Sequence, residues 1–153
     1  MGTSADAPAI HLRLAGPGDA GVMAAIHQAC FAPGWDAAAI GQFLVPGCLS
    51  LLAAPTAEAP AQGLLMARAA ADEAELLTLG VTPLHRRQGL ARALLRSAME
   101  RLQACGVQRL FLEVEQGNRA ALGLYQSLGA VAVGRRPGYY AHGADAAIFS
   151  LAL

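Results

Sequence analysis

The sequence contains no lysine, so all eleven basic residues of this 153-residue chain are arginines. Charged residues of either sign make up only 14% of the chain, and eleven acidic residues bring the formal net charge to zero. A chain without net positive charge is not drawn to nucleic acid or to an anionic membrane, so we expect neither partner. Any anion that this protein binds must be held by arginine side chains or by backbone N–H groups.

Cysteine is scarce as well. Cys30, Cys48 and Cys105 are odd in number and widely spaced, which indicates reduced thiols and not a disulfide framework. His27 lies three residues before Cys30, but two potential ligands do not make a zinc site, and we expect no metal. No apolar run approaches the roughly 18 residues of a transmembrane helix, and the opening MGTSADAP lacks the regions of a secretory signal. We therefore expect a cytoplasmic protein.

Apolar residues, in contrast, are abundant at 55% of the chain, enough for one domain with a core of its own. Their spacing changes repeatedly between the period of a strand and that of a helix, in the order β-α-α-β-β-β-α-β-α-β-β. This order predicts an α/β fold with a single mixed central sheet and helices on both faces. We expect one domain over residues 10–153, behind a flexible N-terminus of residues 1–9.

The predicted strands are 10–14, 48–53, 63–69, 73–81, 107–115, 130–135 and 146–153, and the predicted helices are 16–30, 37–44, 89–105 and 119–128. Asp19, Asp36 and Asn118 stand where helix N-caps belong. Gly106 and Gly129 stand where the last two helices end.

One junction suggests an anion site. The strand 73–81 carries a continuous apolar stretch, which predicts a central position in the sheet. Arg86, Arg87 and Gly89 follow it and lead directly into a helix, whose first N–H groups have no partner within the helix. This chemistry suits a pyrophosphate. A P-loop would need a lysine, and the glycine pattern of a dinucleotide-binding turn is absent. By itself, however, an arginine pair at a helix start is more often solvated surface.

Two longer segments carry a resemblance. AELLTLGVTPLHRRQGLARALL resembles the acetyl-CoA-binding core of the GCN5-related N-acetyltransferases, whose signature [QR]-x-x-G-x-[GA] is matched from Arg86 to Ala91. LFLEVEQGNRAALGLYQSLGA resembles the second half of that core, L-E-V-R-x-x-N-x-x-A-x-x-L-Y-x-x-L-G-F, in the branch that acetylates protein N-termini. The nearest group within it is the bacterial ribosomal-protein-alanine acetyltransferases. The resemblance runs from Ile10 onward, and implies that residues 10–153 form an acetyltransferase domain.

The resemblance implies acetyl-CoA as co-substrate and assigns the residues that bind it. These are Leu79, Gly80, Val81, Arg86, Arg87, Gln88, Gly89, Leu90, Ala91 and Asn118. The turn would hold the pyrophosphate through backbone N–H groups, and the strand before it would pair with the pantetheine arm. The N–H of Val81 could polarise the thioester carbonyl.

The same resemblance assigns two catalytic residues. Glu113 matches the position of the general base, and it stands in an apolar strand where a carboxylate has no packing reason to be. Tyr125 matches the position of the acid that protonates the departing thiolate. Without the resemblance, a strand-end glutamate in water and a core tyrosine would be the ordinary interpretations.

Four residues are expected to contact the acceptor: Trp35, Glu75, Tyr139 and Tyr140. The tyrosine pair matches residues that hold the acceptor peptide backbone. Trp35 also reads as a packing anchor between the first two helices, and Glu75 as an exposed strand start.

The acceptor that the resemblance implies is a protein or peptide N-terminus, such as that of a ribosomal protein. Gly80 replaces a more usual alanine, Pro137-Gly138 replace Arg-Asn, and Ala144-Asp145 replace Glu-Asp. Because the last two changes touch the acceptor wall, two alternatives stay open: acetylation of a small-molecule amine, and a non-catalytic acetyl-CoA-binding regulatory module.

Overall fold

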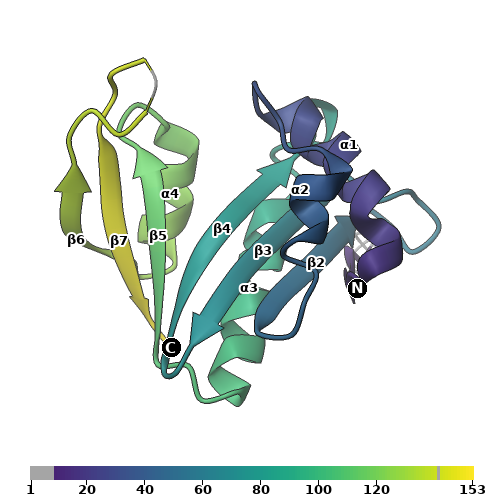
Figure 1. Ribbon diagram of the computed structural model, residues 1–153, viewed down its shortest axis with the longest axis horizontal. Coiled ribbons are helices and arrows are strands. Elements are labelled where there is room, and N and C mark those ends of the chain that lie inside the picture. Colours follow the sequence, from purple (N-terminus) through teal and green to yellow (C-terminus); the bar gives the residue numbers. More distant parts are fainter. Residues whose placement is uncertain (1–8, 141) are drawn as a thin grey trace, which may run out of the picture. The chain divides into compact units, whose positions relative to one another are not determined.

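The computed structural model describes residues 9–140 and 142–153, so residues 1–8 of the predicted flexible N-terminus lie outside the described residues. The elements follow the predicted order (Figure 1). In chain order they are β1 (His11–Leu14), η1 (Pro17–Asp19), α1 (Ala20–Cys30), α2 (Ala37–Gly41), β2 (Cys48–Ala54), β3 (Gly63–Ala70), β4 (Glu73–Val81), η2 (Pro83–His85), α3 (Leu90–Ala104), β5 (Arg109–Glu115), α4 (Arg119–Ser127), β6 (Val131–Arg136) and β7 (Ala146–Ala152). In this part of the chain no helix is both long and apolar enough to cross a membrane.

Seven strands of the described chain form one sheet in the order β1-β2-β3-β4-β5-β7-β6. β1 runs antiparallel to β2, and β7 runs antiparallel to both β5 and β6. β4 and β5 are parallel and pair from Glu73 opposite Arg109 to Glu75 opposite Phe111. The predicted mixed sheet is therefore confirmed, and β4 holds the central place that its apolar stretch indicated.

The chain forms two compact units. The first contains the described residues up to Ala67 together with Leu77–Ala98, and the second contains Arg68–Leu76 and Met99–Leu153. β3, β4 and α3 each contribute residues to both units. The assignment of 10–153 to one acetyltransferase domain stays a prediction.

Helices cover both faces of the sheet in the first unit (Figure 1). One face of β2 and β3 packs against α1 and α2 in a buried cluster of Met23, Ala24, Ile26, Ile40, Leu52, Leu64 and Met66. Successive residues of a strand point to opposite faces, so Gly63 opens onto the other face. There Leu94 of α3 lies 3.1 Å from where a Cβ at Gly63 would stand. The helices on both faces follow from the sequence pattern.

In the second unit, β5 divides its side chains between two faces. Leu110, Leu112 and Val114 are buried in the core, whereas Glu113 and Glu115 between and after them are only partly buried. The two carboxylates therefore share one face of the strand, two residues apart.

Four of the predicted helix ends are confirmed. The side chains of Asp36 and Asn118 accept hydrogen bonds from the backbone N–H three residues later, at 2.8 and 3.2 Å. Gly106 and Gly129 follow α3 and α4 in the left-handed conformation, at φ +89° and +94°.

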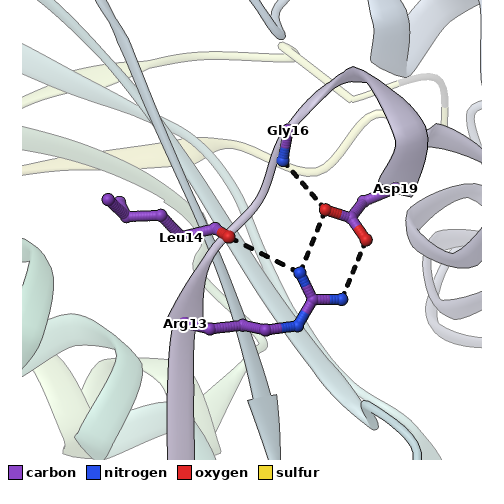
Figure 2. A network of polar contacts seen from close by, with 4 residues as sticks. All are labelled: Arg13, Leu14, Gly16 and Asp19. Carbon is purple, nitrogen blue, oxygen red and sulfur yellow. Dashed lines mark hydrogen bonds and ion pairs between the residues drawn. The ribbon is translucent and has the colours of Figure 1, made fainter.

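The predicted position of Asp19 at the N-cap of α1 is also confirmed, but its side chain makes no capping hydrogen bond. Its carboxylate turns back toward β1, where it accepts from both terminal nitrogens of Arg13 at 2.8 and 3.0 Å and from Gly16 N at 2.9 Å (Figure 2). A bidentate charge-assisted pair is stronger than a hydrogen bond from a neutral N–H. These bonds, those from Arg13 first, lower the pKa of Asp19 to about 2.

We expect Asp19→Asn to lower the free energy of unfolding at neutral pH, because it removes the charge that pairs with Arg13. The loss should be only about 1 kcal/mol, because solvent screens the half-exposed arginine. A folded pKa below the ordinary value of 3.8 means that this stability is present above pH 4 and is lost as the pH falls through about 2. Urea unfolding at a series of pH values should therefore show the wild-type and variant curves converging in acid. Arg13→Gln, which keeps the bond to Gly16, should have an intermediate effect. A difference that does not change with pH would contradict the assignment.

Candidate functional site

The first part of the candidate site is the turn that joins β4 to α3. Gly80 and Val81 at the end of β4 are buried, and Leu79 is half-buried. The short helix η2 follows, then the exposed residues 86–89, and α3 begins at the buried Leu90. The predicted phosphate-binding residues thus form an exposed segment fixed at both ends by buried residues.

The backbone of this turn has the conformation that an anion site needs. Arg87 and Gly89 are both left-handed, at φ +62° and +87°. A Cβ at Gly89 would meet only Ile10 Cδ1, at an ordinary 3.7 Å, so the conformation and not lack of space requires glycine. Left-handed residues in a turn direct successive N–H groups toward one side and form a concave anion site. The first turn of α3, from Leu90 and Ala91, adds the positive end of its dipole.

The two arginines of the turn differ in what they contact. Arg86 Nε donates to the carbonyl of Val81 at 2.9 Å, and the Arg86 side chain also hydrogen-bonds to the thiol of Cys30. Burial raises the pKa of that thiol, and the guanidinium partly opposes the rise. Arg86 therefore closes the turn, whereas Arg87 is exposed and extends the predicted rim of positive charge.

A second set of contacts fixes the start of the turn. Thr82 donates two hydrogen bonds to Gln62, both at 2.8 Å. Its N–H donates to the Gln62 carbonyl and its hydroxyl to the Gln62 side-chain oxygen. His85 Nδ1 lies 3.1 Å from the same hydroxyl. Since that hydroxyl already donates to Gln62, His85 must be the donor to it.

The replacement of alanine by Gly80 has a structural reason. A Cβ at this position would lie 3.0 Å from Cys30 Sγ and 3.2 Å from a ring carbon of Phe31. Both residues belong to the C-terminal end of α1, which therefore packs directly against β4. The glycine permits this close approach.

Trp35 lies in an aromatic cluster next to this contact. Its ring stacks on His27 at 4.5 Å and tilts against Phe43 at 5.5 Å. His27 is buried, accepts from the Trp35 N–H at 2.9 Å through Nδ1, and so donates from Nε2 to Thr78 at 3.1 Å. Burial lowers the pKa of His27, which favours this neutral form. The packing interpretation of Trp35 is confirmed, and its contact with an acceptor stays a prediction. No group of three or more potential metal ligands occurs in the described part of the chain.

The second part of the candidate site lies in the second unit, around Glu113. Its carboxylate is 31% exposed, and its Oε1 lies 3.1 Å from a terminal nitrogen of Arg136 on β6. The guanidinium of Arg136 also lies 5.4 Å from the centre of the Tyr139 ring. The carboxylate is therefore paired with a side chain from β6, a strand that does not adjoin β5.

The segment between β6 and β7 brings the tyrosine pair to the same place. Tyr139 and Tyr140 meet edge to face at 5.1 Å, and Tyr140 stacks on His142 at 5.9 Å. His142 Nε2 in turn bonds Glu115 at 2.7 Å. Burial raises the pKa of Tyr140, and the charges of Tyr139, Glu113 and Glu115 raise it further.

The departures on either side of the tyrosine pair are compatible with an ordered segment. Gly138 is left-handed at φ +62°, and its N–H donates to Asp145 at 2.8 Å. Asp145 also lies 3.4 Å from Arg135. The aspartate that the sequence retains therefore ties the start of the segment to its end.

Tyr125 is a buried polar residue of the second unit. It lies on α4, is only 5% exposed, and its pKa is raised to about 12 by burial and by Tyr140. Glu113, Tyr125 and the tyrosine pair thus belong to one unit.

Two further predicted residues have structural partners. The side-chain oxygen of Asn118 caps α4. Its amide nitrogen is therefore the atom that could donate a hydrogen bond to a ligand. Glu75 pairs with Arg68, whose Nε lies 3.0 Å from it, and about half of each side chain is exposed. The expectation that Glu75 lines the acceptor site stays a prediction.

Comparisons with known proteins agree with this geometry. Residues 26–130 match the sequence profile of the acetyltransferase (GNAT) family. The chain belongs to this family.

The relatives include enzymes that act on a ribosomal protein. [Ribosomal protein bS18]-alanine N-acetyltransferase of Escherichia coli K12 is 46% identical over 69 residues, which cover 45% of this chain and 47% of that protein. The chain thus matches about half the length of these curated relatives. The crystal structure of the ribosomal-protein-S18-alanine N-acetyltransferase from Escherichia coli has a TM-score of 0.86 and 30% identity over 94% of each chain. NAA60 of Arabidopsis thaliana in complex with acetyl-CoA shares the fold, with a TM-score of 0.81 at 21% identity over 95% of this chain and 99% of that one. The predicted resemblance to the ribosomal-protein-alanine branch is confirmed.

Sequence reasoning missed three polar residues of this GNAT chain: Arg136, Glu115 and His142. A signal for Glu115 was present, because it repeats Glu113 two residues later on a strand whose alternate residues are apolar. No local pattern reveals the partners, since Arg136 and His142 reach β5 only through the pairing of distant strands.

The contact at Gly80 gives a stability prediction. Gly80→Ala should lower the free energy of unfolding by about 1–2 kcal/mol, because the added methyl group overpacks the contact with α1. Adding Cys30→Ala should recover part of the loss by removing the closest atom. Gly134→Ala is a matched strand control, since its Cβ would lie 3.6 Å from Ile148, and should change stability by less than about 0.5 kcal/mol. Equal losses for Gly80 and Gly134 in urea unfolding would refute the explanation.

Proposed function

We propose that this GNAT protein transfers an acetyl group from acetyl-CoA to the N-terminal α-amino group of a protein, such as a ribosomal protein. The observation that carries the proposal is that the second unit contains a carboxylate paired with Arg136, a buried phenol and the contacting pair Tyr139 and Tyr140. The named activity of the Escherichia coli relatives supports the choice of acceptor.

Acetyl-CoA is the donor, and it supplies an acetyl group activated as a thioester. Its pyrophosphate is assigned to the N–H groups of residues 86–91, whose left-handed backbone and helix start suit an anion. Leu79, Gly80 and Val81 are assigned to the pantetheine arm, and the amide nitrogen of Asn118 to a further polar contact. The acetyl-CoA complex of NAA60, a protein of the same fold, supports this choice of donor.

Glu113 serves as the base, directly or through a water. An N-terminal ammonium has a pKa of about 7.7–8.0, so part of the amine is already neutral near pH 7 and the base has few protons to remove. The amine nitrogen attacks the thioester carbonyl carbon, the new C–N bond forms, and the C–S bond breaks. The proton lost by the amine goes to Glu113 and from there to solvent.

Tyr125 is assigned as the proton donor to the sulfur that leaves acetyl-CoA. With a pKa of about 12 its phenol is protonated throughout the neutral range, so it is always available as a donor. A thiol has a pKa of about 8.5, so proton transfer from the phenol to the thiolate is uphill and is completed only when solvent returns a proton to the phenol. Until then Tyr125 stabilises the negative charge on the sulfur through a hydrogen bond.

The acceptor peptide is assigned to Tyr139 and Tyr140, with Trp35 and Glu75 as further contacts. Tyr139 is 51% exposed, an unusual position for a tyrosine without a ligand, and its ring is fixed by Arg136 and by Tyr140. A preformed aromatic surface costs little conformational entropy when a peptide binds.

The direct test is acetyl transfer from acetyl-CoA to short peptides with a free N-terminal Ala, Ser or Thr. The protein should acetylate their α-amino group, and Glu113→Gln should reduce kcat by about 10²–10⁴-fold. Tyr125→Phe should reduce kcat by about 10²-fold while acetyl-CoA binding is kept. Acetylation of a polyamine or aminoglycoside with the peptides unmodified would overturn the choice of acceptor. Full activity of both variants would overturn the catalytic assignments.

The cofactor assignment is tested by two glycines of the same conformation. Gly89→Ala and Gly106→Ala should each cost about 1 kcal/mol of stability, because both positions are left-handed. Only Gly89→Ala should also weaken acetyl-CoA binding, by about tenfold, since it displaces the turn. Calorimetric titration measures the affinity of each variant for acetyl-CoA, and urea unfolding measures its stability. Equal affinities for the two variants would rule out the turn as the pyrophosphate site.

A further inference from the structure

We propose that Arg136 is a positioning residue that holds the Glu113 carboxylate in the orientation needed for proton abstraction. The proposal rests on the proposed function, in which Glu113 is the base. Arg136 is the last residue of β6, and a terminal nitrogen of its guanidinium lies 3.1 Å from Glu113 Oε1. Fixing one carboxylate oxygen leaves the other, Oε2, to accept the proton.

Strand register explains why the arginine can reach this carboxylate. β7 lies between β5 and β6, and Ala146 of β7 pairs with Arg136 on one side and with Glu115 on the other. The small, fully buried Ala146 lets the arginine side chain pass over β7. Glu113 lies one step along the same face of β5, two residues from Glu115.

The nearer carboxylate is already occupied. Glu115 bonds His142 at 2.7 Å, so Arg136 pairs diagonally with Glu113 and not directly across with Glu115. The ring of Tyr139, 5.4 Å from the guanidinium carbon, supports Arg136 from the other side. Two separate contacts, with the Glu113 carboxylate and with the Tyr139 ring, therefore define the position of the guanidinium.

The other groups around Glu113 do not duplicate this role in the described second unit. Ile148, opposite Glu113 on β7, is apolar. Tyr140 carries no charge in its phenol form, and Glu115 is of like sign. Arg135, the neighbouring cation, pairs with Asp145 at 3.4 Å. Loss of Arg136 should therefore leave the Glu113 carboxylate without the partner that fixes its orientation.

The strand offers a matched pair of variants, Arg136→Gln and Arg135→Gln, which make the same change one residue apart. Arg136→Gln should lower kcat for peptide acetylation by about fivefold near neutral pH. It should leave the peptide KM within about twofold of wild type, because Arg136 orients the base and does not bind the acceptor. Arg136→Lys should restore most of the rate. Arg135→Gln should leave kcat and KM within about twofold of wild type.

A double-mutant cycle separates this proposal from the assignment of the base. If Arg136 acts through Glu113, then Arg136→Gln should have no further effect on kcat once Glu113→Gln is present. If Glu113→Gln alone keeps full activity, the base assignment fails. If Glu113→Gln is inactive but Arg136→Gln matches wild type in kcat, only the present proposal fails. A raised peptide KM with an unchanged kcat would also overturn it, since that result assigns Arg136 to the acceptor.

Discussion

The pairing of β5 with β7 is the constraint on which the second unit's chemistry depends. Seven residues of β5, from Arg109 to Glu115, pair in antiparallel register with seven residues of β7. One face of β5 is buried in the core, so a slip of one residue would turn both carboxylates inward and is strongly disfavoured. The same register positions β6 and the segment before β7, which supply Arg136, the tyrosine pair and His142. An apolar packing requirement thus fixes the polar groups.

Because the chain contains no lysine, arginine makes the ion pairs and side-chain bonds that a lysine could otherwise supply. Arg13 holds the turn before α1 through Asp19, Arg86 closes the turn after β4, and Arg136 pairs with Glu113. A guanidinium suits these tasks, because its planar fork presents several donors in fixed directions and can bond two acceptors at once. In each case one arginine bridges a strand end and a neighbouring polar group.

The fold was largely predictable, because its signals are local. Apolar periodicity gave the order of the elements, and Asp36, Asn118, Gly106 and Gly129 marked helix ends correctly. Asp19 also marked a helix start correctly, but its carboxylate bonds Arg13, six residues away, instead of a backbone N–H of the helix. Gly80 likewise could not be explained from its neighbours in sequence, because its reason lies in Cys30 and Phe31 on another element.

In the candidate site, too, some features could be predicted from the sequence and others could not. Resemblance assigned roles to Glu113 and Tyr125, but periodicity could not reveal that the base pairs with an arginine from a strand that does not adjoin its own. His142 and Glu115 were overlooked because 27 residues separate the two members of the pair. Local patterns predict which residues carry chemistry, whereas strand register decides which charges surround them.

The central claim is that the amine acetylated is a protein N-terminus. Mass spectrometry of cellular protein N-termini, with and without this protein, tests it most directly. The account predicts that acetylation at one or a few N-termini is lost with the protein and is restored by the wild-type chain but not by Glu113→Gln. N-terminal acetylation that is unchanged in every detected protein, while a small amine loses its acetyl group, would contradict it.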